Sequence, residues 1–457
     1  MTTSWLRNQL FLLPLLPFLA LACGGSQNDS IRPPDDGGFI SDDGGAPGDD
    51  VASEGGEEVG DASTEDAGTA EGGDASDATF SPAAAAGLAV IHGDKSYTAS
   101  LLSLVDPVSG TLIRDNCLNS GTVAPGLSKA LSGDVVLPSA PLPGNPLILI
   151  DRGNSNLIWV DPVHCTAIRQ INVGQGFMAN PHDVLAVTAS KIYVTRYGSN
   201  PKPATPLDGG GDLLVLDPDQ SQPLSRIDLA PLASAPGVNP NPDRGQVLGG
   251  KLFVTLNNFS ADFSKAGPGR VVIVDPATDT VTGSIDLPGL KNCGAIVPVP
   301  GRPASLAIAC AGAFADGADQ IKASGIAIVD TSASPPSVTS LTATSFGRPV
   351  SGSDLAMINA NLGLVVVPGD FSGKPADQMW SFDLAAGLPH MILESQAAFV
   401  LGGLVFDRIS QRVFVGDADA TTPRVRVFDV SGPSPHELPS ISSDPEKGLL
   451  PRSVGLY

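Results

Sequence analysis

Histidine, cysteine and serine are the residues of this chain most able to carry chemistry, and their spacing matches none of the common catalytic or metal-binding patterns. The chain has five histidines, and no two of them have the spacing of a metal-ligand pair. It contains no Cys-x-x-Cys pair and no Gly-x-Ser-x-Gly elbow. The sequence therefore predicts no metal site and names no catalytic residue.

One segment formally matches a cofactor motif. Gly174-Gln175-Gly176 resembles the start of a dinucleotide fingerprint. An apolar strand pattern follows it instead of a helix, so no helix N-terminus is present to hold a pyrophosphate. We therefore expect no cofactor.

The cysteines indicate an oxidising compartment. A four-residue turn at 300–303 would place Cys293 opposite Cys310 on antiparallel strands, within reach of a disulfide. Such a bond would contribute about 3 kcal/mol of stability. Cys165 directly follows a turn, whereas Cys117 lies near the far end of a strand, so free thiols are favoured for this second pair.

The elements that position these residues come from an internal repeat. A short apolar strand that ends in Asp, often followed by Pro and a turn, occurs seven times, and successive copies lie 46 to 58 residues apart. The strand-ending residues are Asp106, Asp161, Asp217, Asp275, Asp330, Asp383 and Asp429. Their position favours a role in turns over a ring of catalytic carboxylates. In such turns the carboxylate accepts a hydrogen bond from the backbone amide two residues later.

Each copy is accompanied by further short strands. One apolar strand precedes it, as in 191–198 and 251–258, and another lies between successive units, as in 182–187. About four strands per unit and a period near 50 residues are typical of propeller blades. We predict an all-β fold in which residues 87–457 form a seven-bladed β-propeller of four-stranded blades.

Residues 156–290 also carry a family resemblance. The stretch INVGQGFMANPHDVLAVTASKIYVTRYGSN, followed by DLLVLDPD, resembles the YVTN-type propeller repeat. Similar propellers include lactonases and quinoprotein-type dehydrogenases, whose active sites lie at the channel mouth. The resemblance implies that His182 opens an inner strand beside the central channel, where it would have either a ligand or a structural role.

The two ends of the predicted propeller, residues 87–457, indicate how the ring closes. The first unit, which begins at 88–94, lacks an inner strand of its own, and the chain ends in a strand-like segment at 453–457. If this segment completes the first blade, no sheet edge is left exposed there.

The N-terminus indicates export. Residues 10–22 are apolar but too short to span a bilayer, and they lead into Ala20-Leu21-Ala22-Cys23, which resembles a lipoprotein signal. We expect a signal peptide at 1–22 and a lipid anchor at Cys23, which would hold the protein at the cell envelope, on the outer membrane, facing the periplasm or the cell surface. An ordinary secretory signal is the alternative.

An acidic segment follows this cysteine. Residues 23–86 contain 16 acidic groups and one basic group, with few large apolar side chains, so they are expected to form a disordered tether. The net charge of −22 for the whole chain disfavours nucleic-acid binding. The expected partners are the membrane, through the anchor, and an unknown protein or small-molecule ligand.

Long connections suggest where such a ligand would bind. The stretches 196–211, 230–247, 257–269, 311–324 and 369–377 would all fall on one face of the ring. The candidate binding residues, together with His182, are Arg196, Tyr197, Asn257, Asn258, Phe259, Phe371 and Lys374. We interpret the protein as a binding module. A propeller enzyme of the lactonase or quinoprotein dehydrogenase type is the alternative, and the long connections would otherwise be tolerated insertions.

Overall fold

The computed structural model describes residues 85–121, 123–370, 372–442 and 448–457. The predicted signal peptide, Cys23 and Phe371 lie outside these residues, as does nearly all of the tether. The chain separates into the units Met1–Phe80 and Ser81–Tyr457, and the second unit is the one described below.

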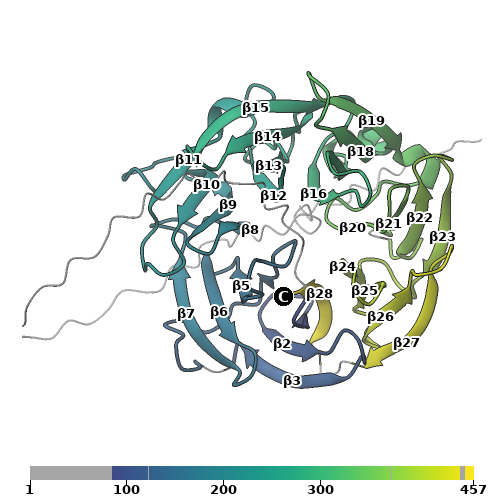
Figure 1. Ribbon diagram of the computed structural model, residues 1–457, viewed down its shortest axis with the longest axis horizontal. Helices are drawn as coiled ribbons and strands as arrows, with labels where there is room; N and C mark the ends of the chain where they lie inside the picture. Colours follow the sequence, from purple (N-terminus) through teal and green to yellow (C-terminus); the bar gives the residue numbers. More distant parts are fainter. Residues whose placement is uncertain (1–84, 122, 371, 443–447) are drawn as a thin grey trace, which may run out of the picture. The chain divides into compact units, whose positions relative to one another are not determined.

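Seven four-stranded antiparallel sheets form a ring, as predicted (Figure 1). Blade 1 contains, from the inner to the outer strand, β28 (Leu450–Leu456), β1 (Leu88–Gly93), β2 (Ser100–Val105) and β3 (Leu112–Asn119). Blade 2 contains β4 (Val135–Val136), β5 (Leu147–Asp151), β6 (Asn156–Asp161) and β7 (Thr166–Asn172). Blade 3 contains β8 (Pro181–Thr188), β9 (Lys191–Ser199), β10 (Gly210–Leu216) and β11 (Ser225–Asp228).

The remaining blades follow in chain order. Blade 4 contains β12 (Pro242–Leu248), β13 (Lys251–Leu256), β14 (Gly269–Asp275) and β15 (Thr280–Leu287). Blade 5 contains β16 (Cys293–Pro298), β17 (Ser305–Ala311), β18 (Ser324–Asp330) and β19 (Ser337–Thr342). Blade 6 contains β20 (Leu355–Met357), β21 (Leu362–Val367), β22 (Gln378–Asp383) and β23 (Pro389–Glu394). Blade 7 contains β24 (Leu401–Asp407), β25 (Arg412–Asp417), β26 (Arg424–Asp429) and β27 (His436–Ser442). Short 3₁₀ helices η1 (Ala230–Leu232), η2 (Phe314–Ala323) and η3 (Ala343–Phe346) lie in connections.

Burial explains the strand sequences. The middle strands pack against a neighbouring blade on both faces, so they are mostly apolar and buried, as in β17, whereas the outer strand β15 alternates between exposed and less exposed residues. The core consists of clusters that each join two blades. In one of them, Val271 of blade 4 packs with Ile308 and Ala327 of blade 5. The ring therefore has several cores between blades instead of one central core.

The repeated aspartates cap turns, as predicted. Oδ1 of Asp106 accepts the backbone N–H groups of Val108 (2.8 Å) and Ser109 (3.0 Å). The other six strand-ending aspartates likewise accept the amide two residues on. The amides of Ser109 and Val108 lower the pKa of Asp106, which is therefore an anionic cap.

The predicted ring closure is present. Strand β28 pairs antiparallel with β1, with Leu456 opposite Leu88 and Val454 opposite Val90. The carbonyl oxygen of Tyr457 accepts the N–H group of Gly87 (3.1 Å), and the Tyr457 hydroxyl leaves no room for a Cβ at position 87. The two ends of the propeller are therefore joined within one sheet.

Both disulfides form, and one of them corrects the sequence prediction. Cys293 and Cys310 are paired in register and bonded, as expected. Cys117 and Cys165 are also bonded, with their Cα atoms 4.9 Å apart, so the expectation of free thiols was wrong. Cys117 lies on the outer strand of blade 1 and Cys165 in a turn of blade 2. The comparison of strand positions within single blades missed this contact between neighbouring blades.

We predict that deleting residues 451–457 destabilises the propeller by more than about 4 kcal/mol, because the deletion exposes the inner edge of blade 1 and breaks the pairing of the two termini. Chemical denaturation followed by circular dichroism would measure the loss. A truncated chain that unfolds at the same denaturant concentration as the full-length chain would contradict the closing role of β28.

His92, on β1 at this closing seam, is fully buried. Burial lowers its pKa from 6.5 to about 4, although a contact with the Leu449 backbone offsets part of the effect. Because the unfolded chain then binds a proton that the folded chain does not, stability falls as the pH falls from 6.5 towards 4.

We therefore expect His92 to contribute about 3 kcal/mol of the stability lost over this pH range. Unfolding free energies of the wild type and of His92→Leu at pH 7 and pH 4.5 would measure the contribution, since the variant lacks the titrating group. His164→Gln, which changes an exposed histidine, is the control. Equal pH dependence in the wild type and His92→Leu would refute the expectation.

Candidate functional site

The long connections lie on one face of the ring, as the sequence suggested. We call this end the loop face; it carries the connections between the second and third strands and those between blades. They include 200–209, 229–241, 257–268, 312–323 and 368–377. The opposite end, the turn face, carries short turns such as 189–190 and 249–250, with the longer connection 137–146 in blade 2 as an exception.

His182 lies on β8 at the loop-face end of this inner strand. Its Nδ1 is 2.7 Å from Oδ1 of Asp243, which occupies the same place on β12 of the next blade. The imidazole stacks on the Tyr197 ring, with the ring centres 4.2 Å apart. Asp243 and Tyr197 therefore hold the imidazole on two sides, and only 7% of the His182 side chain is exposed.

Asn257 extends the contact to a third blade. Its Nδ2 donates to Oδ2 of Asp243 (3.2 Å) and to Oδ1 of Asn292 (2.7 Å), which directly precedes β16. The Asp243 carboxylate and the Asn257 amide together therefore connect blades 3, 4 and 5. We call His182, Tyr197, Asp243, Asn257 and Asn292 the inner cluster.

The electrostatics of the inner cluster determine its protonation. Burial lowers the pKa of His182 despite the opposing effect of Asp243. Burial alone would raise the pKa of Asp243, but the hydrogen bond from His182 and the charges of Arg244 and Arg152 hold it below its usual value. The arrangement is therefore a neutral imidazole whose Nδ1–H donates to an ionised carboxylate, which leaves Nε2 as a hydrogen-bond acceptor.

Two arginines border the inner cluster. Nε of Arg244 is 3.8 Å from Oδ1 of Asp243, and its Nη1 is 3.7 Å from Oδ1 of Asp183. Arg152, whose charge also acts on His182, donates from Nε (3.0 Å) and Nη2 (2.5 Å) to Asp134. These guanidinium groups keep 18% and 13% of their side-chain surface exposed, so charged groups form the border between the cluster and solvent.

Arg196, a predicted ligand-binding residue, lies elsewhere and is structural. It is fully buried and forms two hydrogen bonds to Asp212, from Nε to Oδ1 (2.7 Å) and from Nη2 to Oδ2 (2.6 Å). Its Nη1 donates to the Val173 carbonyl (3.1 Å). No part of this guanidinium faces solvent, so the structure gives it no access to a ligand.

The other predicted residues are also separate from the inner cluster. Asn258 holds its own loop by donating to the carbonyl of Pro268 (3.1 Å), and Phe259 is buried. Lys374 is exposed in the connection between β21 and β22 of blade 6. Of the predicted set, the structure therefore brings together His182, Tyr197 and Asn257.

Sequence reasoning missed Asp243, although a signal was available. The sequence Asn-Pro-His-Asp at 180–183 returns as Asn-Pro-Asp-Arg at 241–244. Asn180 and Asn241 both have left-handed backbones, with φ of 45° and 46°, as does Asn292 with φ of 53°. An asparagine in this conformation directly precedes the inner strand in three successive blades, so aligning the repeats on it would have placed Asp243 beside His182.

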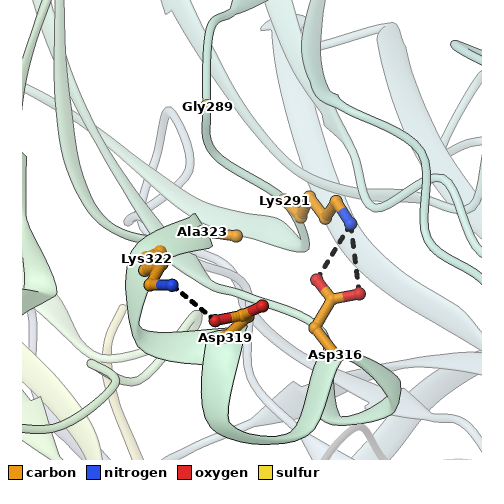
Figure 2. A pocket seen from close by; sticks show the side chains of 6 residues that line it. All are labelled: Gly289, Lys291, Asp316, Asp319, Lys322 and Ala323. Atoms are coloured by element: carbon orange, nitrogen blue, oxygen red, sulfur yellow. Dashed lines mark hydrogen bonds and ion pairs between the residues drawn. The ribbon is translucent and has the colours of Figure 1, made fainter.

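A hollow of about 430 Å³ lies on the loop face at blade 5 (Figure 2). Figure 2 shows its charged side chains in two pairs, Lys291 with Asp316 (2.9 Å) and Lys322 with Asp319 (2.6 Å). Because each charge already has a partner of opposite sign, the hollow offers little to a charged ligand.

Neither a metal cluster nor a membrane-spanning helix occurs in the described part of the chain. These residues contain no group of three or more His, Cys, Asp or Glu side chains that could hold a metal ion. None of their helices is long and apolar enough to cross a membrane.

The fold has counterparts among solved structures. A hypothetical selenium-binding protein from Sulfolobus tokodaii is similar with a TM-score of 0.56 and 12% identity, over 82% of this chain and 94% of that one. A functionally unknown protein from Desulfotomaculum acetoxidans has a TM-score of 0.47 and 9% identity, over 81% and 98% of the chains. AztD from Citrobacter koseri has a TM-score of 0.41 and 11% identity, over 81% and 89%. No family model and no curated protein matches the sequence. The first likeness supports the propeller fold alone.

We predict that Arg196→Met lowers the free energy of unfolding by about 3–5 kcal/mol, because it leaves the buried Asp212 carboxylate without its main partner. Lys374→Met, at an exposed position, should change stability by less than about 0.5 kcal/mol. Urea denaturation of both variants would measure the difference. If Arg196→Met were as stable as the wild type, the arginine would not be needed for folding and would be free for another role.

Proposed function

We propose that this protein is an exported propeller, anchored at the cell envelope through a lipid on Cys23, that acts as a binding module. The apolar segment 10–22 and the cysteine that follows it support the anchor. Two disulfides support export, because such bonds persist in oxidising compartments. We assign the anchor to the outer membrane, with the propeller in the periplasm or at the cell surface.

The inner cluster is the observation that carries the binding function. It lies at the loop-face end of the inner strands, where three blades meet, and it holds polar side chains in fixed orientations. Polar side chains held in this way at one end of the inner strands, on the face that carries the long loops, are typical places for ligands. The ligand would be a small molecule or an exposed group of a protein.

We also assign the repeats to the YVTN type. The sequence pattern in residues 156–290 supports this assignment, and the strands of blades 3 and 4 coincide with the motif. The assignment concerns the repeat and adds no activity.

A second function, catalysis by a propeller enzyme of the lactonase or quinoprotein dehydrogenase type, is favoured by the His182–Asp243 pair. A neutral histidine oriented by a carboxylate has the geometry of a general base. Turnover of a lactone or a quinone-linked substrate by the purified protein, abolished in His182→Ala, would establish this function in place of simple binding.

Cell fractionation would test the anchor. We expect the wild type in the membrane fraction and Cys23→Ser in the soluble fraction, because the variant lacks the sulfur that carries the lipid. The double variant Cys293→Ser/Cys310→Ser is the matched control and should remain with the membrane. A Cys23→Ser protein that still sediments with the membrane would rule out the anchor, while crosslinking on intact cells would identify a partner in either case.

A further inference from the structure

We propose that the inner cluster binds a small neutral polyhydroxy compound, such as a monosaccharide or cyclitol, through His182 Nε2 and Asn257 Oδ1. The proposal rests on the binding function above and names the class of ligand. Within the described residues, both atoms are buried and neither has a hydrogen-bond partner. Buried polar atoms are almost always paired, so two unpaired atoms in one cluster point to a missing group.

Asp243 makes both atoms acceptors. Its Oδ1 accepts the Nδ1–H of His182, so the neutral ring presents a lone pair at Nε2. Its Oδ2, together with Oδ1 of Asn292, uses both amide hydrogens of Asn257, which fixes the amide and leaves its Oδ1 as an acceptor. Any group that satisfies these two atoms must donate hydrogen bonds.

The bordering arginines supply donors beside these acceptors. Nη2 of Arg244 and Nη1 of Arg152 make no hydrogen bond within the described residues, whereas other atoms of both groups do. A hydroxyl group donates one hydrogen bond and accepts others, so it matches a site that offers both. Two or more hydroxyl groups on one small frame would satisfy both acceptors together.

Charged ligands fit less well. A carboxylate or phosphate oxygen only accepts hydrogen bonds, so it cannot pair with His182 Nε2 or Asn257 Oδ1. An ammonium group could donate, but it would meet the repulsion of the Arg152 and Arg244 charges, which act on His182 against the attraction of Asp243. A neutral donor avoids both costs.

A ligand that enters the site must pass the charged side chains at its border. The side chains of Asp134, Arg152, Asp243 and Arg244 retain 13–18% exposure, whereas Nε2 and Oδ1 are covered. We expect a long arginine side chain to swing aside as the ligand enters, since flexible surface side chains reorient readily.

The test uses the purified full-length chain with its histidines isotopically labelled at Cε1. D-glucose and myo-inositol are the polyhydroxy probes, and succinate and ethylammonium are the charged probes. We expect a polyhydroxy probe to bind with a dissociation constant of about 1 mM or lower and to shift the His182 resonance. His182→Phe and Asn257→Leu should each weaken calorimetric binding at least tenfold, whereas Lys95→Ala, at an exposed position, should not.

Failure of both polyhydroxy probes to shift the His182 resonance in the wild type would overturn the proposal, and so would tighter binding of a charged probe at His182. Unchanged affinity in folded His182→Phe and Asn257→Leu would also overturn it. The wild-type resonance tests the proposal even if a variant does not fold. A negative result here leaves the binding module standing if surface crosslinking recovers a partner, so the two failures are distinguishable.

Discussion

The pairing of β28 with β1 is the interaction on which the rest of the structure depends. Each blade buries its faces against two neighbours, so an open ring would leave two apolar faces in water. The closing sheet joins Tyr457 to Gly87, residues at opposite ends of the propeller sequence. Because this contact joins residues far apart in sequence, it forms only when all the blades between them are in place. The blades are therefore held in position only in the complete ring.

Ring closure also explains how the inner cluster is held. His182, Asp243 and Asn292 come from three successive blades, and none of these blades positions the others locally. Their orientation therefore depends on the spacing between inner strands, which the closed ring sets. Asp183 adds to this linkage by accepting the Gly245 amide of the next blade (3.0 Å). The cluster is therefore a structural joint between blades as well as a set of oriented polar groups.

Sequence reasoning succeeded for contacts within a blade and for the number of blades. The strand-ending aspartates and the Cys293–Cys310 bond follow from period and register along one chain segment. The closing strand follows from the inner strand that the first unit lacks and the extra strand at the end of the last unit. It failed where the contact crosses between blades, as for Cys117 with Cys165. Arg196 illustrates a different limit, because a pattern shows that an arginine follows a strand but not that Asp212 will bury it. The first contact depends on how neighbouring sheets face each other, and the second on the register of β9 with β10, which places Asp212 opposite Arg196. No repeat pattern gives either of these.

The capping aspartates have a consequence for the molecule as a whole. All seven end their third strand at the turn face, so this end of the ring carries a circle of carboxylates. Their hydrogen bonds to backbone amides leave the negative charge in place, although Lys251 offsets the charge of Asp275. Two copies brought together by their turn faces would oppose two such circles across a narrow gap, at a Coulomb cost that grows as salt is removed. The turns that end the strands thus also disfavour face-to-face stacking of two propellers.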